Sequence, residues 1–127
     1  MRDAGGLRPV ELTPPIDEAQ ILALRAGDMV RIRGIVVTAR DAAHKWMVEQ
    51  LIEGHPPPRD IPVYEALKRA LRGGVIFHCG PIVRRSEGGW EFVSAGPTTS
   101  ARAEIYQDRV IEHFGVRVVV GKGGMGR

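Results

Sequence analysis

Short apolar runs of strand type alternate with segments of helical periodicity, and this alternation restricts the fold more than any other feature. Residues 75–79 and 116–120 are mostly apolar runs, and residues 29–37 alternate at first and then become continuously apolar. Continuous apolar strands are typical of parallel sheets that are covered on both faces. Strands that alternate with helices predict an α/β domain.

A β-hairpin interrupts this alternation. Residues 82–85 and 90–94 flank the turn sequence SEGG, and this spacing predicts two antiparallel strands. We therefore expect a mixed sheet with a parallel part and an antiparallel part. A short edge strand should precede Pro14 and Pro15, because proline ends a strand or confines it to an edge.

Helices are expected between these strands. They should cover residues 16–24, a stretch that starts at Thr38, residues 64–71, and a stretch that ends at Phe114 and is capped by Gly115. Thr38 with Asp41 resembles an N-cap. The apolar stripe of the second helix is predicted to contain Ala42, Ala43, Trp46, Met47, Gln50 and Leu51. The inner face of the last helix is predicted to contain Ile105, Val110, Ile111 and Phe114.

The length of 127 residues predicts one domain, 1–127, with a modest core. No apolar run approaches the roughly 20 residues that cross a bilayer, and the first residues do not resemble a secretory signal. We therefore expect a cytoplasmic protein without a membrane partner. Cys79 is the only cysteine, which excludes an internal disulfide. One thiolate is also too few for an iron–sulfur cluster, which usually takes about three or four.

The formal net charge of +3 would suit an anionic partner. The basic residues are dispersed along the chain and aromatic residues make up only 6% of it. Nucleic-acid-binding proteins usually concentrate basic residues on one stripe with interleaved aromatics. A small anionic ligand is therefore the better prediction, and no nucleic-acid partner is expected.

Three segments could bind such an anion. Two apolar strands lead into expected helix starts that carry Arg40 and Arg102, and a third leads into a glycine-rich loop that carries Lys122. Helix starts offer unpaired N–H groups, and arginine binds carboxylates through two parallel hydrogen bonds. All three segments follow the carboxyl ends of strands, where open α/β sheets place their ligands. A site with Arg40, Arg102 and Lys122 would suit a small dicarboxylate.

Each feature also has an ordinary structural explanation. Thr38 is typical of a simple helix cap, an isolated arginine is typical of a solvated surface, and the glycine-rich end lacks the GxxxxGK pattern of a phosphate-binding loop. His78 and Cys79 are predicted to be core residues, whereas His44 and Lys45 are predicted to lie on a helix surface. Composition and spacing alone are therefore compatible with an anion site but do not require one.

Four sequence stretches together resemble a known family. In order, GDMVRIRGIVVTARDAAHK, IFHCGPIV, SAGPTTSAR and VVVGKGGMG are similar to the β component of class I fumarases and L(+)-tartrate dehydratases, from about Gly27 to the end. The resemblance implies a swivelling β/β/α-type domain. It also implies an α partner that carries a catalytic 4Fe–4S cluster, and αβ pairs assembled as a dimer. The family's domain continues past GKGGMG, so we expect this chain to lack the C-terminal elements.

The resemblance also implies roles for individual residues. Arg40, Arg102 and Lys122 would bind the substrate carboxylates, and Thr98, Arg102 and Lys122 would take part in catalysis. No residue of this chain would bind a metal. The implied reaction is the reversible hydration of fumarate to malate, or the dehydration of tartrate to oxaloacetate. Thr98 would move the carbon-bound proton or only position the substrate, and the alternative for the whole chain is a non-catalytic anion- or protein-binding module.

Overall fold

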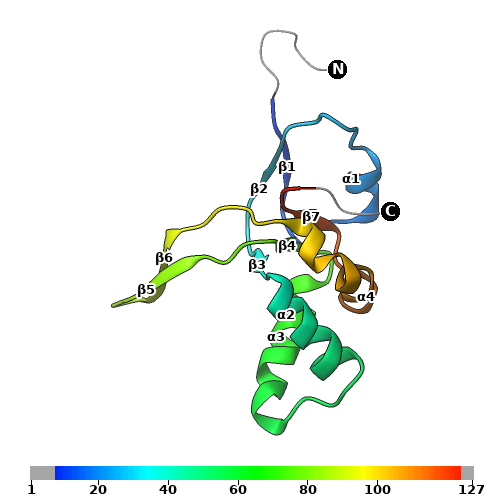
Figure 1. Ribbon diagram of the computed structural model, residues 1–127. Coiled ribbons are helices and arrows are strands. Elements are labelled where there is room, and N and C mark those ends of the chain that lie inside the picture. Colours follow the sequence, from blue (N-terminus) through cyan, green and yellow to red (C-terminus); the bar gives the residue numbers. More distant parts are fainter. Residues whose placement is uncertain (1–7, 124–127) are drawn as a thin grey trace.

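The computed structural model describes residues 8–123 and confirms an α/β domain (Figure 1). Within these residues, no helix is long and apolar enough to cross a membrane. In chain order, the elements are β1 (Val10–Leu12), α1 (Glu18–Leu22), β2 (Val30–Ile32), β3 (Val37–Thr38), α2 (Asp41–Trp46), the π-helix η1 (Met47–Ile52), the 3₁₀ turn η2 (Pro58–Asp60), α3 (Ile61–Leu71), β4 (Val75–Phe77), β5 (Ile82–Ser86), β6 (Gly89–Ser94), the 3₁₀ turn η3 (Ser100–Ala103), α4 (Glu104–Phe114) and β7 (Val118–Val120).

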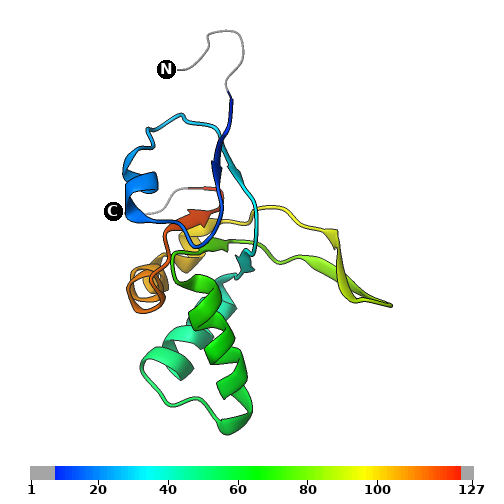
Figure 2. The same ribbon diagram turned by 180° about the vertical axis from the view of Figure 1, so that it is seen from behind.

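The central sheet has the strand order β3-β4-β7, and both pairings are parallel. Its two faces follow from the alternation of side chains along a strand. Ile76 of β4 faces the core shared with helices α2, α3 and α4, whereas the neighbouring Val75 faces the core shared with β1, β2 and α1. The parallel pair β1–β2 and α1 therefore cover one face of the central sheet, and α2, α3 and α4 cover the other (Figure 2).

The predicted strand 29–37 is wrong in one respect, because it forms two strands in different sheets. β2 ends at Ile32 and β3 begins at Val37. Gly34 lies between them with a φ of 117°, a backbone conformation that glycine adopts without strain. The chain therefore turns at Gly34 and passes from one sheet to the other.

The helix predicted from Thr38 also starts later than expected. Thr38 belongs to β3, the helix begins at Asp41, and the N-cap is Arg40 without a side-chain hydrogen bond. α2 then continues as the π-helix η1, and the buried residues of the two are His44, Met47, Val48 and Leu51. His44, predicted on the surface, is fully buried, whereas Gln50 of the predicted stripe is exposed.

The inner face of α4 was predicted correctly in part. Val110 and Phe114 are buried, but Ile105 is 68% exposed and Ile111 is 36% exposed, and Gln107 is buried instead. Gly115 ends the helix in the left-handed conformation, with a φ of 76°, as predicted. A buried glutamine in place of an isoleucine shows that this end of the helix packs against polar groups.

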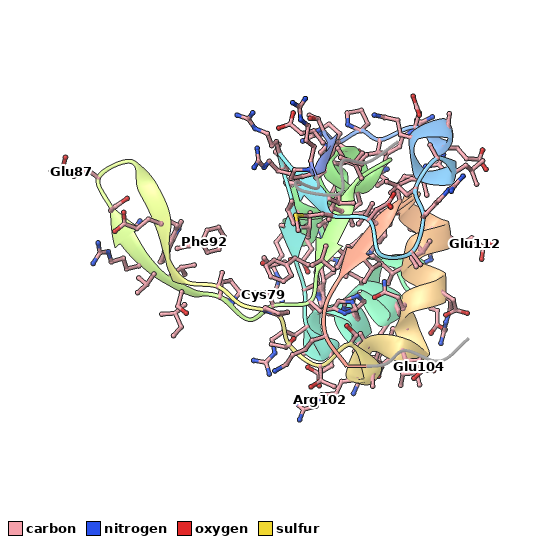
Figure 3. All side chains as sticks on the ribbon, turned by 90° about the horizontal axis from the view of Figure 1, so that it is seen from above. Cys79, Glu87, Phe92, Arg102, Glu104 and Glu112 are labelled. Atoms are coloured by element: carbon pink, nitrogen blue, oxygen red, sulfur yellow. The ribbon has the colours of Figure 1, made fainter. Side chains whose placement is uncertain are left out.

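The predicted hairpin is confirmed, but it does not share a sheet with the parallel strands. β5 and β6 form a separate antiparallel pair that projects away from the rest of the domain (Figure 3). All its residues are exposed, and among them are Trp90 at 69% and Phe92 at 65%. The expected mixed sheet is therefore three separate sheets within the described part of the chain, because the hairpin strands pair only with each other.

Candidate anion site at the carboxyl edge of the sheet

The candidate site lies where the three parallel strands end. Backbone hydrogen bonds hold the segments that leave these strands side by side: the Ala39 N–H donates to the Phe77 carbonyl at 3.0 Å, and the His78 N–H donates to the Val120 carbonyl at 2.7 Å. Parallel strands bring their carboxyl ends to the same edge. Arg40 and Lys122, which follow β3 and β7, are thus brought to one edge of the sheet.

A fourth segment, residues 98–102, inserts at the same edge. Thr98 N–H donates to the His78 carbonyl at 2.7 Å, and Lys122 N–H donates to the Thr98 carbonyl at 3.3 Å. Ser100 N–H in turn donates to the Lys122 carbonyl at 2.7 Å. The segment then turns into η3, from which the exposed Arg102 projects (Figure 3). Thr98 and Lys122 are therefore hydrogen-bonded neighbours, and Arg102 lies four residues after Thr98 on the same segment.

The Arg40 side chain crosses the edge toward the base of the hairpin. A Cβ atom at Gly80 would lie 2.5 Å from the Cδ atom of Arg40 and 2.7 Å from its Nη1 atom. The guanidinium therefore lies against the backbone of Gly80. Arg40 is an N-cap residue and Arg102 lies in a 3₁₀ turn, so neither occupies the first α-helical turn that the sequence suggested.

A buried polar cluster lies directly beneath this edge, and no sequence pattern predicted that its members would contact one another. It consists of His44, His78, Ser100 and Gln107, each at most 4% exposed. The His78 Nδ1 atom lies 2.8 Å from Ser100 Oγ, and its Nε2 atom lies 2.5 Å from Gln107 Oε1. His78 and Cys79 are core residues, as predicted. The spacing of Ser100, Ala103, Gln107 and Val110 along one helical face was the signal that could have identified Gln107.

His44 connects the cluster to the Arg40 segment. Its Nδ1 atom lies 2.8 Å from the Arg40 carbonyl, and its ring meets that of His78 edge to face at 5.2 Å between centroids. Burial lowers the pKa of His44 below its usual value, and the neighbouring His78 lowers it further, against the opposing effect of the Arg40 carbonyl. His44 is therefore a neutral imidazole near pH 7.

The Thr98 hydroxyl is hydrogen-bonded to the main chain. It donates to the His78 carbonyl at 3.1 Å. A carbonyl oxygen accepts a hydrogen bond but is far too weakly basic to take the proton away, so this contact does not activate the hydroxyl. The geometry favours the positioning role for Thr98 over the role of a base.

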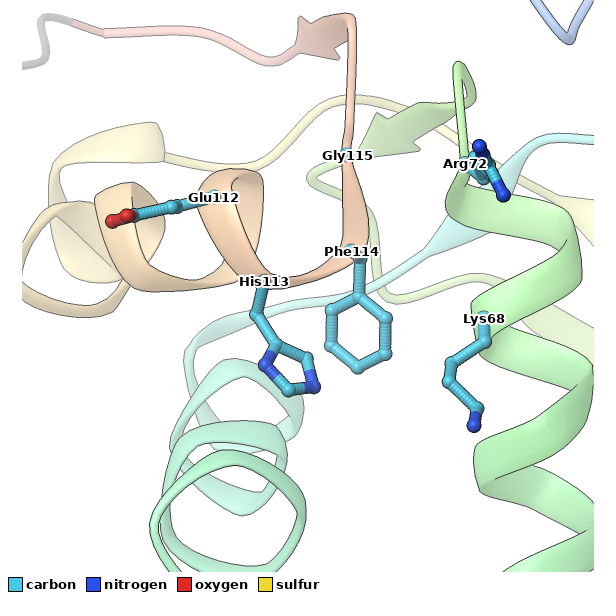
Figure 4. Close-up of a pocket in the computed structure, with 6 residues that line it drawn as sticks. All are labelled: Lys68, Arg72, Glu112, His113, Phe114 and Gly115. Carbon is cyan, nitrogen blue, oxygen red and sulfur yellow. The ribbon is translucent and has the colours of Figure 1, made fainter.

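Among the pockets lined by described residues, two lie away from this edge. One of about 350 Å³ is lined by Lys68, Arg72, Glu112, His113, Phe114 and Gly115 (Figure 4). Another of about 300 Å³ is lined by Ile52, Arg109, Glu112 and His113. Gly115 precedes β7 whereas Lys122 follows it, so the first cavity lies toward the opposite end of the sheet. Neither cavity contains a residue of the candidate site.

The residues of this chain do not fit an iron–sulfur cluster. Cys79, the only cysteine, is 2% exposed and follows a core strand. Among the residues described, there is no group of three or more His, Cys, Asp or Glu side chains that could hold a metal ion. A cluster that served this site would have to be bound by another chain or segment.

Fold and site together define an α/β domain that presents exposed cationic side chains and a threonine at the carboxyl edge of a parallel sheet. A family model described as Fumarase C-terminus matches residues 2–127, and the chain belongs to this family. The resemblance that the sequence motifs suggested is thereby confirmed.

Individual relatives agree with this assignment. The L(+)-tartrate dehydratase subunit beta of Escherichia coli is 44% identical over 115 residues, which cover 91% of this chain and 51% of that protein. A second relative is a protein of Geobacillus stearothermophilus that is provisionally named fumarate hydratase class I. It is 46% identical over 121 residues, which cover 94% of this chain and 21% of that protein. The chain thus spans about half the length of the first relative and about a fifth of the second.

Proposed function

We propose that this chain supplies the β half of the active site of an iron–sulfur-dependent hydro-lyase that reversibly hydrates or dehydrates a small dicarboxylate. The observation that carries the proposal is the convergence of three segments at one edge of the sheet, which bear Arg40, Thr98 with Arg102, and Lys122. The names of the relatives supply the reaction: fumarate to malate, or tartrate to oxaloacetate. The substrate among these dicarboxylates is left to the experiment below.

The side chains suit the charges of such a substrate. The exposed guanidinium groups of Arg40 and Arg102 can each bind one carboxylate through two hydrogen bonds, and Lys122 adds a compact positive charge. When the carbon-bound proton leaves a dicarboxylate, negative charge develops on the neighbouring carboxylate. Fixed cations at that position stabilise the charge more in the transition state than in the ground state. Thr98, held by the His78 carbonyl, would orient the substrate.

A partner completes the proposal. The 4Fe–4S cluster would be carried by an α subunit, since this chain has no residues that fit it, and αβ pairs would assemble as a dimer in the cytoplasm. The layering of β1–β2, the central sheet and the helices is consistent with a swivelling β/β/α domain. The hairpin surface of Ile82, Val83, Trp90, Phe92 and Val93 is exposed on this chain and would be covered in a heteromer.

The test is reconstitution under anaerobic conditions with an α-type subunit of the same family. The pair should turn over fumarate or tartrate, and Arg102→Ala should abolish turnover while the circular dichroism spectrum is unchanged. Arg117→Ala is the matched control, because Arg117 is exposed and precedes β7, at the opposite end of the strand from Lys122. Full activity of Arg102→Ala would contradict the site.

The alternative is a non-catalytic anion- or protein-binding module, and the exposed apolar hairpin is the observation that favours it. A module would form the complex through the hairpin without producing turnover. If the Trp90→Ser chain still bound the α subunit and the native pair were active, the hairpin would be excluded as the principal contact between the two subunits. Complex formation without any turnover would favour the module.

A further inference from the structure

We propose that His78 and Gln107 are positioning residues that fix the Arg40 and Arg102 segments through one directed chain of polar contacts, in which three links are hydrogen bonds and the fourth, between Gln107 and His44, is inferred. The chain runs from the Ser100 hydroxyl through His78, Gln107 and His44 to the Arg40 carbonyl. Its geometry does not depend on the proposed function, but its role in substrate binding does.

The direction of the chain is determined at the Arg40 carbonyl. A carbonyl only accepts, so the His44 Nδ1 atom, 2.8 Å away, must carry the proton. The ring is buried and neutral, because burial lowers its pKa. A neutral ring that is protonated at Nδ1 has a lone pair at Nε2. That lone pair requires a donor.

Gln107 is the donor that this lone pair requires. The His44 Nε2 and Gln107 Nε2 atoms are both buried, and neither has another hydrogen-bond partner. The Gln107 side chain lies close enough to raise the pKa of His44, against the larger effect of burial, but the two nitrogen atoms do not meet the geometry of a hydrogen bond. One atom offers a lone pair and the other offers N–H groups, so they are complementary. Leaving both unpaired in the core would be costly.

The orientation of Gln107 then determines the state of His78. With its amide nitrogen toward His44, Gln107 presents Oε1 to His78 Nε2 at 2.5 Å. Oε1 only accepts, so His78 is protonated at Nε2 and its Nδ1 atom accepts from Ser100 Oγ at 2.8 Å. The opposite amide orientation would place two acceptors against each other at His44. With both rings neutral, only one arrangement of protons therefore satisfies every link.

The two ends of the chain lie in the segments that carry the candidate cations. Ser100 is bonded through its N–H to the Lys122 carbonyl and precedes Arg102 by two residues, whereas the other end is the backbone of Arg40 itself. Gly121 lies against both Ser100 and His78, where a Cβ atom would be 1.9 Å from Ser100 Oγ. Because every member is buried, the loss of one link leaves its neighbours unsatisfied. The chain thus links the positions of the two arginine segments.

Nitrogen-15 NMR of the imidazole rings tests the proton arrangement in the native chain. We expect His44 as the neutral Nδ1–H tautomer and His78 as the neutral Nε2–H tautomer at pH 7. The opposite tautomer of either ring would overturn the proposal. This measurement needs no variant and no catalytic activity.

Gln107→Glu gives a second, independent test. Glutamate retains an acceptor for His78 but presents an acceptor to the His44 lone pair, so His44 should gain a second proton at pH 7. The titratable groups that act on His44 in the native chain, Asp41 and His78, are unchanged. Gln50→Glu, on the exposed face of η1, is the matched control and should leave both rings unaltered. An unaltered His44 ring in a folded Gln107→Glu chain would contradict the proposal.

The reconstituted enzyme separates this proposal from the proposed function. Gln107→Glu should raise the KM for the dicarboxylate about tenfold, the equivalent of one hydrogen bond of about 1.4 kcal/mol, and should lower kcat less. Expected tautomers without any hydro-lyase activity would support the hydrogen-bond chain and remove the proposed function. Hydro-lyase activity together with reversed tautomers would support the proposed function and overturn the hydrogen-bond chain.

Discussion

Gly121→Ala tests the close packing between the glycine loop and the buried cluster. An added Cβ atom would lie 1.9 Å from Ser100 Oγ, 2.9 Å from His78 Nδ1 and 3.3 Å from His78 Cβ. Gly121 is not among the glycines with positive φ, so any effect comes from this contact and not from backbone strain. The nearest neighbours are buried, which leaves them little room to move.

The magnitude follows from two contributions. Overpacking a core position typically costs about 1–3 kcal/mol. Displacing Ser100 Oγ would also break its hydrogen bond to His78, a loss of about 1 kcal/mol. Since the two effects share the same movement, we expect a decrease of about 2–3 kcal/mol in the free energy of unfolding.

Gly96→Ala is the control for this substitution. Gly96 lies in the loop after β6, a Cβ atom added there would meet no atom within 4 Å, and its φ is not positive. We expect Gly96→Ala to be neutral or to stabilise the chain by up to about 1 kcal/mol, because alanine has less conformational freedom in the unfolded chain. In the Gly121→Ala background, Ser100→Ala should cost less than in the native chain, since it removes the atom at 1.9 Å.

Urea unfolding followed by far-ultraviolet circular dichroism measures all of these chains. If Gly121→Ala were as stable as Gly96→Ala, the loop would not press on the cluster and the packing argument would be refuted. If the double variant showed no coupling, the contact with Ser100 would not be the cause of the loss.

Two further predictions concern the buried histidine and the exposed hairpin. Because the pKa of His44 is lowered in the folded chain, the unfolded chain binds a second imidazole proton at a higher pH than the folded chain does. The contribution of His44 to the free energy of unfolding is therefore fully present above about pH 6.5. It is lost as the pH drops through the folded-state pKa, by at most about 1.4 kcal/mol per pH unit. His44→Asn should flatten this dependence in urea titrations between about pH 5 and 7, while His55→Asn, at an exposed loop position, should leave the slope as it is. Trp90→Ser and Phe92→Ser should change the free energy of unfolding by less than about 0.5 kcal/mol, since both side chains are mostly exposed, yet weaken co-purification with the α subunit; a large loss of stability would show that the hairpin packs within this chain.

The elements that were predicted correctly depend on local signals. The hairpin follows from two strand-like runs around a glycine-rich turn, and the end of α4 follows from Gly115. β4 and β7 are apolar throughout because they have a packed layer on each face. Such signals involve residues close in sequence, so they can be read without knowledge of the fold.

The errors arise where distant residues decide. Residues 29–37 look like one strand, yet the chain changes sheets at Gly34, where β1 and β4 offer separate edges for pairing. His44 lies on the buried stripe of Met47, Val48 and Leu51, which is rotated from the stripe that the sequence predicted, because the neighbouring sheet and α4 decide which face of the helix is covered. The hairpin strands were expected in a common sheet, but neither of them pairs with the parallel strands within the described residues.

The sequence alone determined the α/β class, the family and the identity of the candidate residues, because these depend on patterning and on motifs of neighbouring residues. Only the tertiary structure decided that Arg40, Thr98 and Lys122 meet at one edge, through hydrogen bonds between segments far apart in the chain. It also decided the burial of His44 and Gln107 beneath that edge. Buried polar groups need hydrogen-bond partners. Here the groups that contact one another come from α2, from the residue after β4 and from α4, which only the fold brings together.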